Sequence, residues 1–140
     1  MLYIQANINI RGVHQMKNTE DLYLEMFDKI IEKESKNGIE GLSQNERNFY
    51  LVDSLLMELN NGGFDQYFLN WTGEHWQETV SILDNLEISF LSNLVKKANE
   101  IYHSDKSEDD ILDELNELDN EFYNNLNYED TYEKVMKLIN

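Results

Sequence analysis

Apolar residues recur along most of this chain at the three- and four-residue spacing that is typical of amphipathic helices. Proline is absent, and the six glycines fall at a few points that separate the apolar runs. The pattern predicts six to seven helices, at about residues 18–37, 43–60, 64–72, 76–85, 90–102, 107–122 and 128–139. A weak interval near residues 86–89 leaves open whether the fourth and fifth runs form one helix or two.

Several residues at the ends of these runs are suited to start or stop a helix. Ser43 and Glu46 have the spacing of a capping box, and Ser107 precedes a first turn rich in carboxylates. Gly38 suits the left-handed residue that follows a helix, and residues 60–63 (Asn-Asn-Gly-Gly) are expected to stop the second helix. Local sequence therefore supports the boundaries that the periodicity predicts.

The predicted helices present apolar faces that together form one core. The residues expected to point inward are Leu22, Met26, Phe27, Ile30, Ile31, Phe49, Val52, Leu56, Leu59, Phe64, Tyr67, Phe68, Trp71, Trp76, Val80, Leu83, Phe90, Leu91, Leu94, Val95, Ala98, Ile101, Tyr102, Ile111, Leu115, Leu118, Phe122, Tyr132, Val135, Met136 and Ile139. Before them, Leu2 to Ile10 alternates apolar with other residues and indicates a short strand or extended arm. We predict an all-α, single-domain bundle (residues 18–140) preceded by an N-terminal arm (residues 1–17).

Charge narrows the range of partners. The chain has 28 acidic and 11 basic residues and a formal net charge of −17. Such a surface repels nucleic acid and anionic membranes, so we expect neither as a direct partner and predict a basic protein instead. Cysteine is absent, and the sequence has neither a signal-peptide pattern nor an apolar stretch of about 20 residues, so we expect a cytoplasmic protein without a membrane span.

Negative charge is concentrated in residues 105–121, which hold nine acidic residues and one base. Four carboxylates recur there at every fourth position, and we call them the carboxylate ladder: Asp109, Asp113, Glu117 and Glu121. On a helix they lie about 6 Å apart along one face, a spacing comparable to that of phosphates along a DNA strand. Like charges at this spacing weaken a helix by about 0.2–0.5 kcal/mol per pair, so the ladder is not explained by the stability of its own helix.

Two other interpretations of this acidic segment stay open. A solvated acidic face that keeps the protein soluble has the same sequence pattern. A calcium-binding loop is partly matched by Asp105, Ser107, Asp109 and Asp113, but the loop's glycine is missing and its twelfth position is Asn116.

A second group of residues lies between the second and third predicted helices. It comprises Asn60, Asn61, Gly62, Gly63, Phe64, Gln66, Tyr67, Phe68 and Asn70, and we call it the central motif. Asparagine and glycine tolerate the backbone conformations that end a helix, and the aromatic side chains bury the next helix. The amides of Asn61, Gln66 and Asn70 either hydrogen-bond across the turn or contact a ligand.

The central motif resembles the signature of a bacterial family of small acidic helical proteins named after a DNA-mimic protein. Residues 42–50 (Leu42-Ser43, Glu46-Arg47 and Tyr50) resemble the family's lead-in, and residues 118–123 (Leu-Asp-Asn-Glu-Phe-Tyr) resemble its C-terminal motif. The likeness covers about residues 18–139. It implies a helical fold and a homodimer that presents carboxylates, in the manner of DNA phosphates, to a transcription factor.

Two parts of the chain depart from this resemblance. Trp71 and Thr72 stand where the family more often has small polar residues before a glycine. The arm from Met1 to Ile10 has no counterpart in the family pattern and is expected to be specific to this chain.

Little in the sequence indicates catalysis. The three histidines lie far apart, and His75 and Glu78 alone have a helical spacing suited to a shared metal ion. With Glu58 they would form a metal-dependent hydrolase site if the three converged in a pocket. The sequence shows no nucleophile elbow, phosphate-binding loop or dinucleotide fingerprint. We therefore expect no enzyme, no catalytic residue, no metal and no cofactor.

We predict an acidic binding protein that acts as a DNA mimic and occupies the nucleic-acid-binding surface of a basic DNA-binding protein. An immunity or counter-defence inhibitor of a basic toxin or nuclease is the alternative, because it requires the same acidic face. The residues predicted to bind the partner are Asp109, Asp110, Asp113, Glu114, Glu117, Glu121, Glu129 and Asp130.

Overall fold

The computed structural model describes residues 9–10, 13–14 and 17–139. In these residues the elements, in chain order, are β1 (Asn9–Ile10), β2 (Val13–His14), α1 (Thr19–Asn37), η1 (Ile39–Gly41), α2 (Gln44–Leu69), η2 (Trp71–His75), α3 (Trp76–Asn85), α4 (Ser89–Tyr102), α5 (Glu108–Asn125) and α6 (Tyr128–Met136). The two η elements are short 3₁₀ helices. The predicted all-α class and single domain are confirmed.

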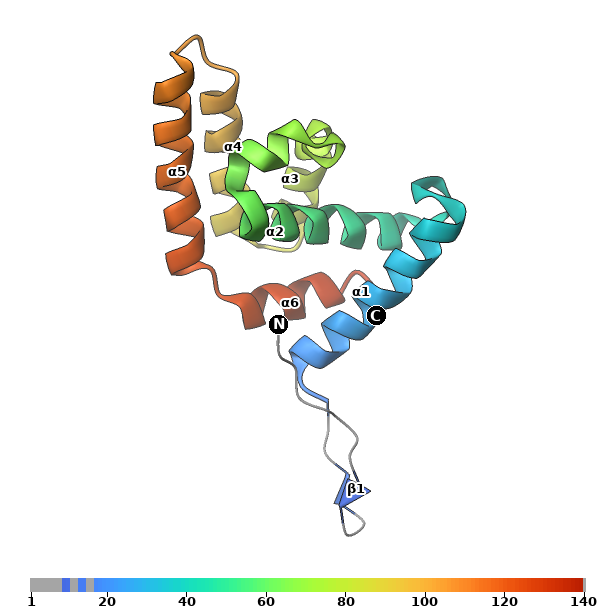
Figure 1. The fold of residues 1–140 in the computed structure, drawn as a ribbon. Coiled ribbons are helices and arrows are strands. Elements are labelled where there is room, and N and C mark those ends of the chain that lie inside the picture. The colour runs from blue at the N-terminus through green and yellow to red at the C-terminus, as the bar shows by residue number, and fades with distance from the viewer. Residues whose placement is uncertain (1–8, 11–12, 15–16, 140) are drawn as a thin grey trace.

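Helix α2 is the centre of the fold, because it packs against each of the other five α-helices. Figure 1 shows α2 crossing the middle of the molecule, with α5 along one side and α4 beside it. At the other side, α6 packs against α1. The chain therefore places its most acidic helix, α5, at the outside of the bundle.

The core lies around α2 and is built from the apolar faces that the periodicity predicts. Phe49, Leu55, Phe64 and Tyr67 of α2 are fully buried, and so is Phe122 of α5. A well-packed core of this kind holds each helix in one orientation.

Helix ends follow the local sequence in most cases. The capping box is present: the N–H of Glu46 donates to Ser43 Oγ at 3.2 Å, and the N–H of Ser43 donates to Glu46 Oε1 at 2.8 Å. Ser107 caps α5 by accepting from the N–H of Asp110 at 3.1 Å. Gly38 does end α1, but with φ 73° and ψ 172° it is not in the predicted left-handed helical conformation.

The predicted break of the helix at residues 60–63 is confirmed at Gly63, although no loop separates the two helical segments. Helix α2 continues from Gln44 to Leu69, and Gly63 alone has a non-helical backbone, with φ 76° and ψ −169°. The chain therefore bends at one residue and resumes the helix immediately, because the N–H of Phe64 finds an acceptor elsewhere in the fold.

Three residues expected to point inward are exposed instead. Leu22, Trp71 and Phe90 have exposed fractions of 45%, 45% and 38%. For Trp71 the reason is local: α2 ends at Leu69, and the extended Asn70 turns the chain before η2 begins. Trp71 therefore does not lie on the same helical face as Phe64, because the helix ends before residue 71.

The weak interval after residue 85 separates two helices. The chain turns between α3 and α4 through Glu87, which has a positive φ of 61°. The last helix is shorter than predicted and ends at Met136, although Val135 is buried as expected.

The described part of the arm is a two-stranded antiparallel hairpin, in which Asn9 pairs with His14 and Ile10 with Val13. The predicted strand from Leu2 to Ile10 falls mostly on residues 1–8, which lie outside the described residues. The division into an arm (1–17) and a domain (18–140) stays a prediction.

Candidate functional site

The carboxylate ladder lies on the outer face of α5. Asp109, Asp113, Glu117 and Glu121 are all exposed. The opposite face of the same helix buries Leu115, Leu118 and Phe122 against α2 and α4. Amphipathic folding of α5 therefore turns the ladder toward solvent as a row.

Among the described residues, none of the four ladder carboxylates forms an ion pair. Two of the other predicted binding residues do. Lys106 Nζ lies 2.7 Å from Glu114 Oε2, and Lys134 Nζ lies 3.1 Å from Asp130 Oδ2. The predicted surface thus divides into a ladder with free carboxylates and flanking carboxylates that are partly neutralised.

The remaining predicted residues extend the exposed surface at both ends of the ladder. Asp110 and Glu129 are exposed, and Glu129 lies in the first turn of α6. Two residues, Leu126 and Asn127, separate α5 from α6, so this turn follows the ladder closely along the chain.

One carboxylate of α5 faces the opposite way and supports the central motif. Asp119 Oδ1 accepts a hydrogen bond from the backbone N–H of Phe64 at 2.9 Å, across 55 residues of sequence. Burial raises the pKa of Asp119, and this bond opposes the rise. Asp119 therefore acts as the cap of the helical segment that resumes after Gly63.

Two tyrosines join the same helix region to the motif by hydrogen bonds. Tyr123 donates to the carbonyl oxygen of Leu59 at 2.7 Å, and Tyr128 donates to Asn60 Oδ1 at 2.8 Å. Asn60 in turn donates from Nδ2 to the carbonyl oxygen of Leu56 at 2.9 Å. These bonds connect α5 and α6 to the motif region, a connection that sequence spacing did not indicate.

Two motif amides meet at one carboxylate, Glu58, which precedes them by 8 and 12 residues. Gln66 Nε2 donates to Glu58 Oε2 at 3.3 Å, and Asn70 Nδ2 donates to the same oxygen. Of the two open interpretations for these amides, hydrogen bonding across the bend is the one observed for Gln66 and Asn70.

An aromatic-walled groove lies beside the motif, between α1, α2 and α6. Its volume is about 480 Å³, and it is lined by Tyr23, Leu24, Phe27, Asp53, Leu56, Met57, Glu58, Asn60, Asn61 and Tyr132. A smaller hollow of about 330 Å³ shares Asp53, Met57 and Glu58 and continues toward Trp71. We call the larger space the Asp53 groove.

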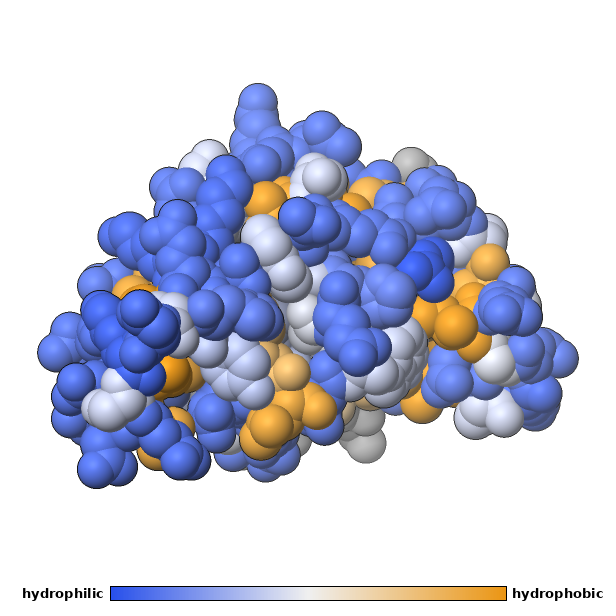
Figure 2. Space-filling view, turned by 90° about the horizontal axis from the view of Figure 1, so that it is seen from above, coloured by the Kyte–Doolittle hydropathy of each residue, from blue (hydrophilic) through white to orange (hydrophobic). Residues whose placement is uncertain are grey.

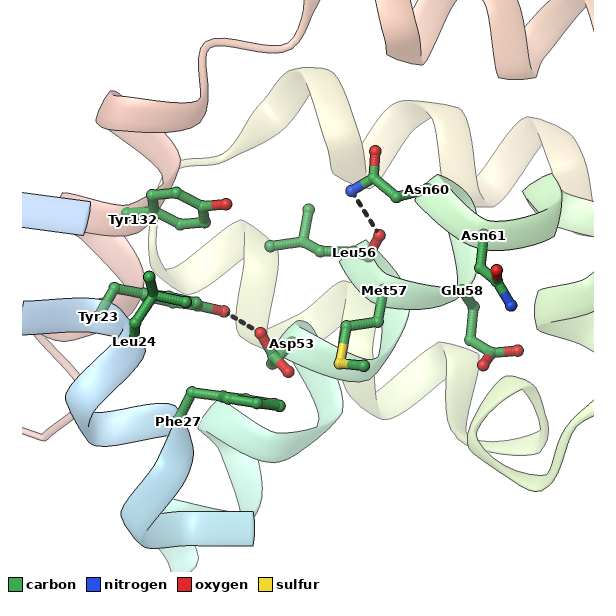
Figure 3. A pocket seen from close by; sticks show the side chains of 10 residues that line it. All are labelled: Tyr23, Leu24, Phe27, Asp53, Leu56, Met57, Glu58, Asn60, Asn61 and Tyr132. Carbon is green, nitrogen blue, oxygen red and sulfur yellow. Dashed lines mark hydrogen bonds between the residues drawn. The ribbon is translucent and has the colours of Figure 1, made fainter. Parts of the chain in front are cut away.

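Asp53 lies at the floor of this groove and is buried, with 7% of its surface exposed. Figure 3 shows the Tyr23 hydroxyl pointing at its carboxylate, and Tyr23 donates a short hydrogen bond to Oδ1. Burial raises the pKa of Asp53 to about 6, against the opposing effect of this bond. Burial and the neighbouring Asp53 together raise the pKa of Tyr23.

Asp53 is not among the residues predicted from the sequence, although its position carries a signal. Asp53 lies four residues after Phe49 and three before Leu56, on the face of α2 that carries its core residues. A carboxylate at such a position is rarely buried without a reason.

The residues considered for a metal site do not converge. Glu78 binds the Arg47 guanidinium through two hydrogen bonds of 3.0 Å, while His75 Nδ1 lies 3.7 Å from Glu78 Oε1. Glu58 belongs to the separate Gln66 and Asn70 group. The described part of the chain contains no group of three or more side chains placed to hold a metal ion.

Within residues 9–10, 13–14 and 17–139, no helix combines the length and the apolar character that a membrane span requires.

Fold and surface together define a small, acidic, all-helical domain with a row of exposed carboxylates on an outer helix. Residues 40–140 match the profile of the DMP19-like protein family, and the chain belongs to that family. No curated protein and no solved structure matches this chain. The predicted family is thereby confirmed, while the central motif as its signature stays a prediction.

The matched region contains α2 to α6, and with them the ladder and the central motif. It begins later than the resemblance suggested, at residue 40 and not at residue 18. Helix α1, which supplies Tyr23, Leu24 and Phe27 to the Asp53 groove, lies outside the match.

Proposed function

We propose that this protein is a DNA mimic that presents the carboxylate ladder of α5 to the nucleic-acid-binding surface of a basic protein. The ladder takes the place of a row of phosphates, and arginine and lysine side chains of the partner bind it. The proposal places this activity in the cytoplasm.

The observation that carries the proposal is the exposed row Asp109, Asp113, Glu117 and Glu121, which forms no ion pair with any described residue. Four carboxylates on one rigid face attract a basic partner more strongly than scattered charges do, and they steer its approach. Family membership supports the same role. Figure 2 shows one face of the molecule, which is mostly hydrophilic with smaller apolar patches.

The scaffold beneath the ladder permits a clean test. Leu115, Leu118 and Phe122 hold α5 by burial, and Asp119 and Tyr123 hold it by hydrogen bonds. Because the ladder residues contribute to none of these interactions, neutralising them leaves the helix in place.

The first experiment compares a ladder variant with the natural chain in partner capture from a cell lysate at low salt. The ladder variant carries Asp109→Asn, Asp113→Asn, Glu117→Gln and Glu121→Gln. We expect the captured basic protein to be lost or its Kd to rise by about tenfold to a hundredfold, since each exposed ion pair contributes about 0.2–1 kcal/mol. The free energy of unfolding should stay within about 1 kcal/mol, because relief of repulsion along α5 offsets a weaker helix-dipole interaction at Asp109.

A matched control removes four carboxylates elsewhere: Asp28→Asn, Glu40→Gln, Glu74→Gln and Glu100→Gln, all exposed. It has the same net charge as the ladder variant and should retain the partner. Equal weakening by both variants would mean that total charge and not the ladder attracts the partner, and would overturn the proposal. Competition by duplex DNA for the captured protein supports mimicry, whereas a captured nuclease or toxin whose activity is blocked supports the inhibitor role.

We also propose that the protein is a homodimer, as the family resemblance implies. Among the described residues, β1 and β2 form a sheet of two strands, and a two-stranded hairpin has little stability by itself. Sedimentation velocity should give twice the chain mass of 16.6 kDa. A single species at the monomer mass across micromolar concentrations would contradict the dimer without affecting the ladder proposal.

A further inference from the structure

The Asp53 groove has a chemical character that the DNA-mimic role does not use. Aromatic rings of Tyr23, Phe27 and Tyr132 form its walls, with Tyr23 and Tyr132 stacked at a centroid distance of 4.2 Å. The exposed Met57 stands at its edge, and Asp53 lies within it. In Figure 3, these side chains from α1, α2 and α6 surround one common space.

The described residues satisfy only part of the hydrogen-bonding capacity of the Asp53 carboxylate. Among the described residues, Tyr23 provides the one hydrogen bond that its carboxylate receives. None of the ten lining residues carries a positive charge. A buried carboxylate is normally paired with a cation, or both of its oxygens accept hydrogen bonds. The second oxygen of Asp53 is therefore suited to a positive group from outside the chain.

We propose that the Asp53 groove binds a small organic cation, with its ammonium or guanidinium group at Asp53 and its apolar stem between Tyr23, Phe27 and Met57. The carboxylate accepts charge-assisted hydrogen bonds from the cation, and the aromatic faces add cation–π attraction. Glu58, at the edge, adds a second negative charge. No residue of α5 lines this groove, so the cation proposal does not depend on the proposed DNA mimicry.

The dimensions and position of the groove agree with such a ligand. A volume of about 480 Å³ lies within the usual range of small-molecule pockets, roughly 300–1,000 Å³. It holds more than a single ammonium group, so an apolar body is expected on the ligand. Because α1 lies outside the region that matches the family, two aromatic walls are supplied by a part of the chain that the family profile does not cover.

Methyl NMR on the full chain tests the proposal with tyramine and agmatine as cationic probes. The chain has five methionines, and Met57 is assigned from the spectrum of Met57→Leu. We expect saturable one-site binding with a shift of the Met57 methyl signal for at least one probe. The neutral analogue 4-ethylphenol, which has the body of tyramine without its ammonium group, should bind about tenfold more weakly or not at all.

Asp53→Asn is the variant that isolates the charge, because asparagine keeps an oxygen that accepts the hydrogen bond from Tyr23. It should weaken binding of the cation by about tenfold to a hundredfold. The control Glu40→Gln removes one exposed carboxylate from η1, which does not line the groove, and should leave binding unchanged. A folded Asp53→Asn variant is verified by its unaltered helical circular dichroism.

Three outcomes would overturn the proposal: equal binding of tyramine and 4-ethylphenol, unchanged affinity in Asp53→Asn, or a non-saturating response that Glu40→Gln reduces equally.

Binding of N-acetylarginine amide distinguishes the source of the cation. If it binds more tightly than both free amines, the group belongs to an arginine side chain of a partner protein. If a free amine binds more tightly, the ligand is a small metabolite; both results support a cation site.

Discussion

Replacing Gly63 with alanine is expected to lower the free energy of unfolding by about 3 kcal/mol, a large loss for a single methyl group. Gly63 has φ 76° and ψ −169°, a region that residues other than glycine occupy at a cost of about 1–3 kcal/mol. A Cβ there would lie 2.2 Å from Asp119 Oδ2, displacing the carboxylate that accepts from the N–H of Phe64. Chemical denaturation followed by circular dichroism measures the loss.

The neighbouring glycine provides the control for this prediction. A Cβ on Gly62 would meet Gln66 Oε1 at 2.1 Å and Gln66 Cβ at 2.9 Å, so Gln66 must move and its hydrogen bond to Glu58 is lost, but the backbone of Gly62 is helical. Alanine also favours the helix over glycine by up to about 1 kcal/mol. Gly62→Ala should therefore lower the free energy of unfolding by clearly less than Gly63→Ala does. Equal destabilisation by the two substitutions would show that the bend at Gly63 is not the critical feature.

Asp53→Asn is expected to stabilise the domain at neutral pH, by up to about 3 kcal/mol. The pKa of Asp53 is about 6 in the folded protein, against 3.8 for the unperturbed carboxyl group. The folded state therefore retains a proton that the unfolded state has already released between about pH 4 and pH 6. Over that window the ionisation of Asp53 makes the natural chain less stable as pH rises, and above it the full penalty is present.

The measurement is the difference in free energy of unfolding between the natural chain and Asp53→Asn, at pH 4 and at pH 7. Other titrating groups, including Glu46 and Glu78 whose pKa values are lowered, are common to both proteins and cancel in the difference. We expect the advantage of the asparagine variant to be small at pH 4 and largest at pH 7. A variant that is less stable than the natural chain at pH 7 would indicate that the ionised carboxylate already has a partner.

This penalty links the stability of the fold to the ligand proposed for the groove. A carboxylate that destabilises the protein at neutral pH is characteristic of a functional site. A bound cation would relieve the penalty, so tyramine or agmatine should raise Tm above pH 6 more than at pH 4.

The candidate site was predictable in part. The ladder followed directly from the four-residue spacing of its carboxylates, because a helix turns those positions to one side whatever else it contacts. The roles of Glu114 and Asp130 did not follow, since their pairing with Lys106 and Lys134 depends on which rotamers and neighbours the folded chain provides. Asp119 was the least predictable, because its function is to accept a hydrogen bond from a residue 55 positions away.

What the sequence by itself determined is therefore the local order: the helical class, the caps at Ser43 and Ser107, and the outward face of α5. These features depend on interactions within about four residues, which spacing alone specifies. Tertiary structure decided the rest. It resumed the helix directly after the break at Gly63, because Asp119 accepts from the N–H of Phe64, and it formed the Asp53 groove by bringing Tyr23, Asp53 and Tyr132 together from three helices. Contacts between such distant residues leave no regular spacing in the sequence, and packing alone creates them.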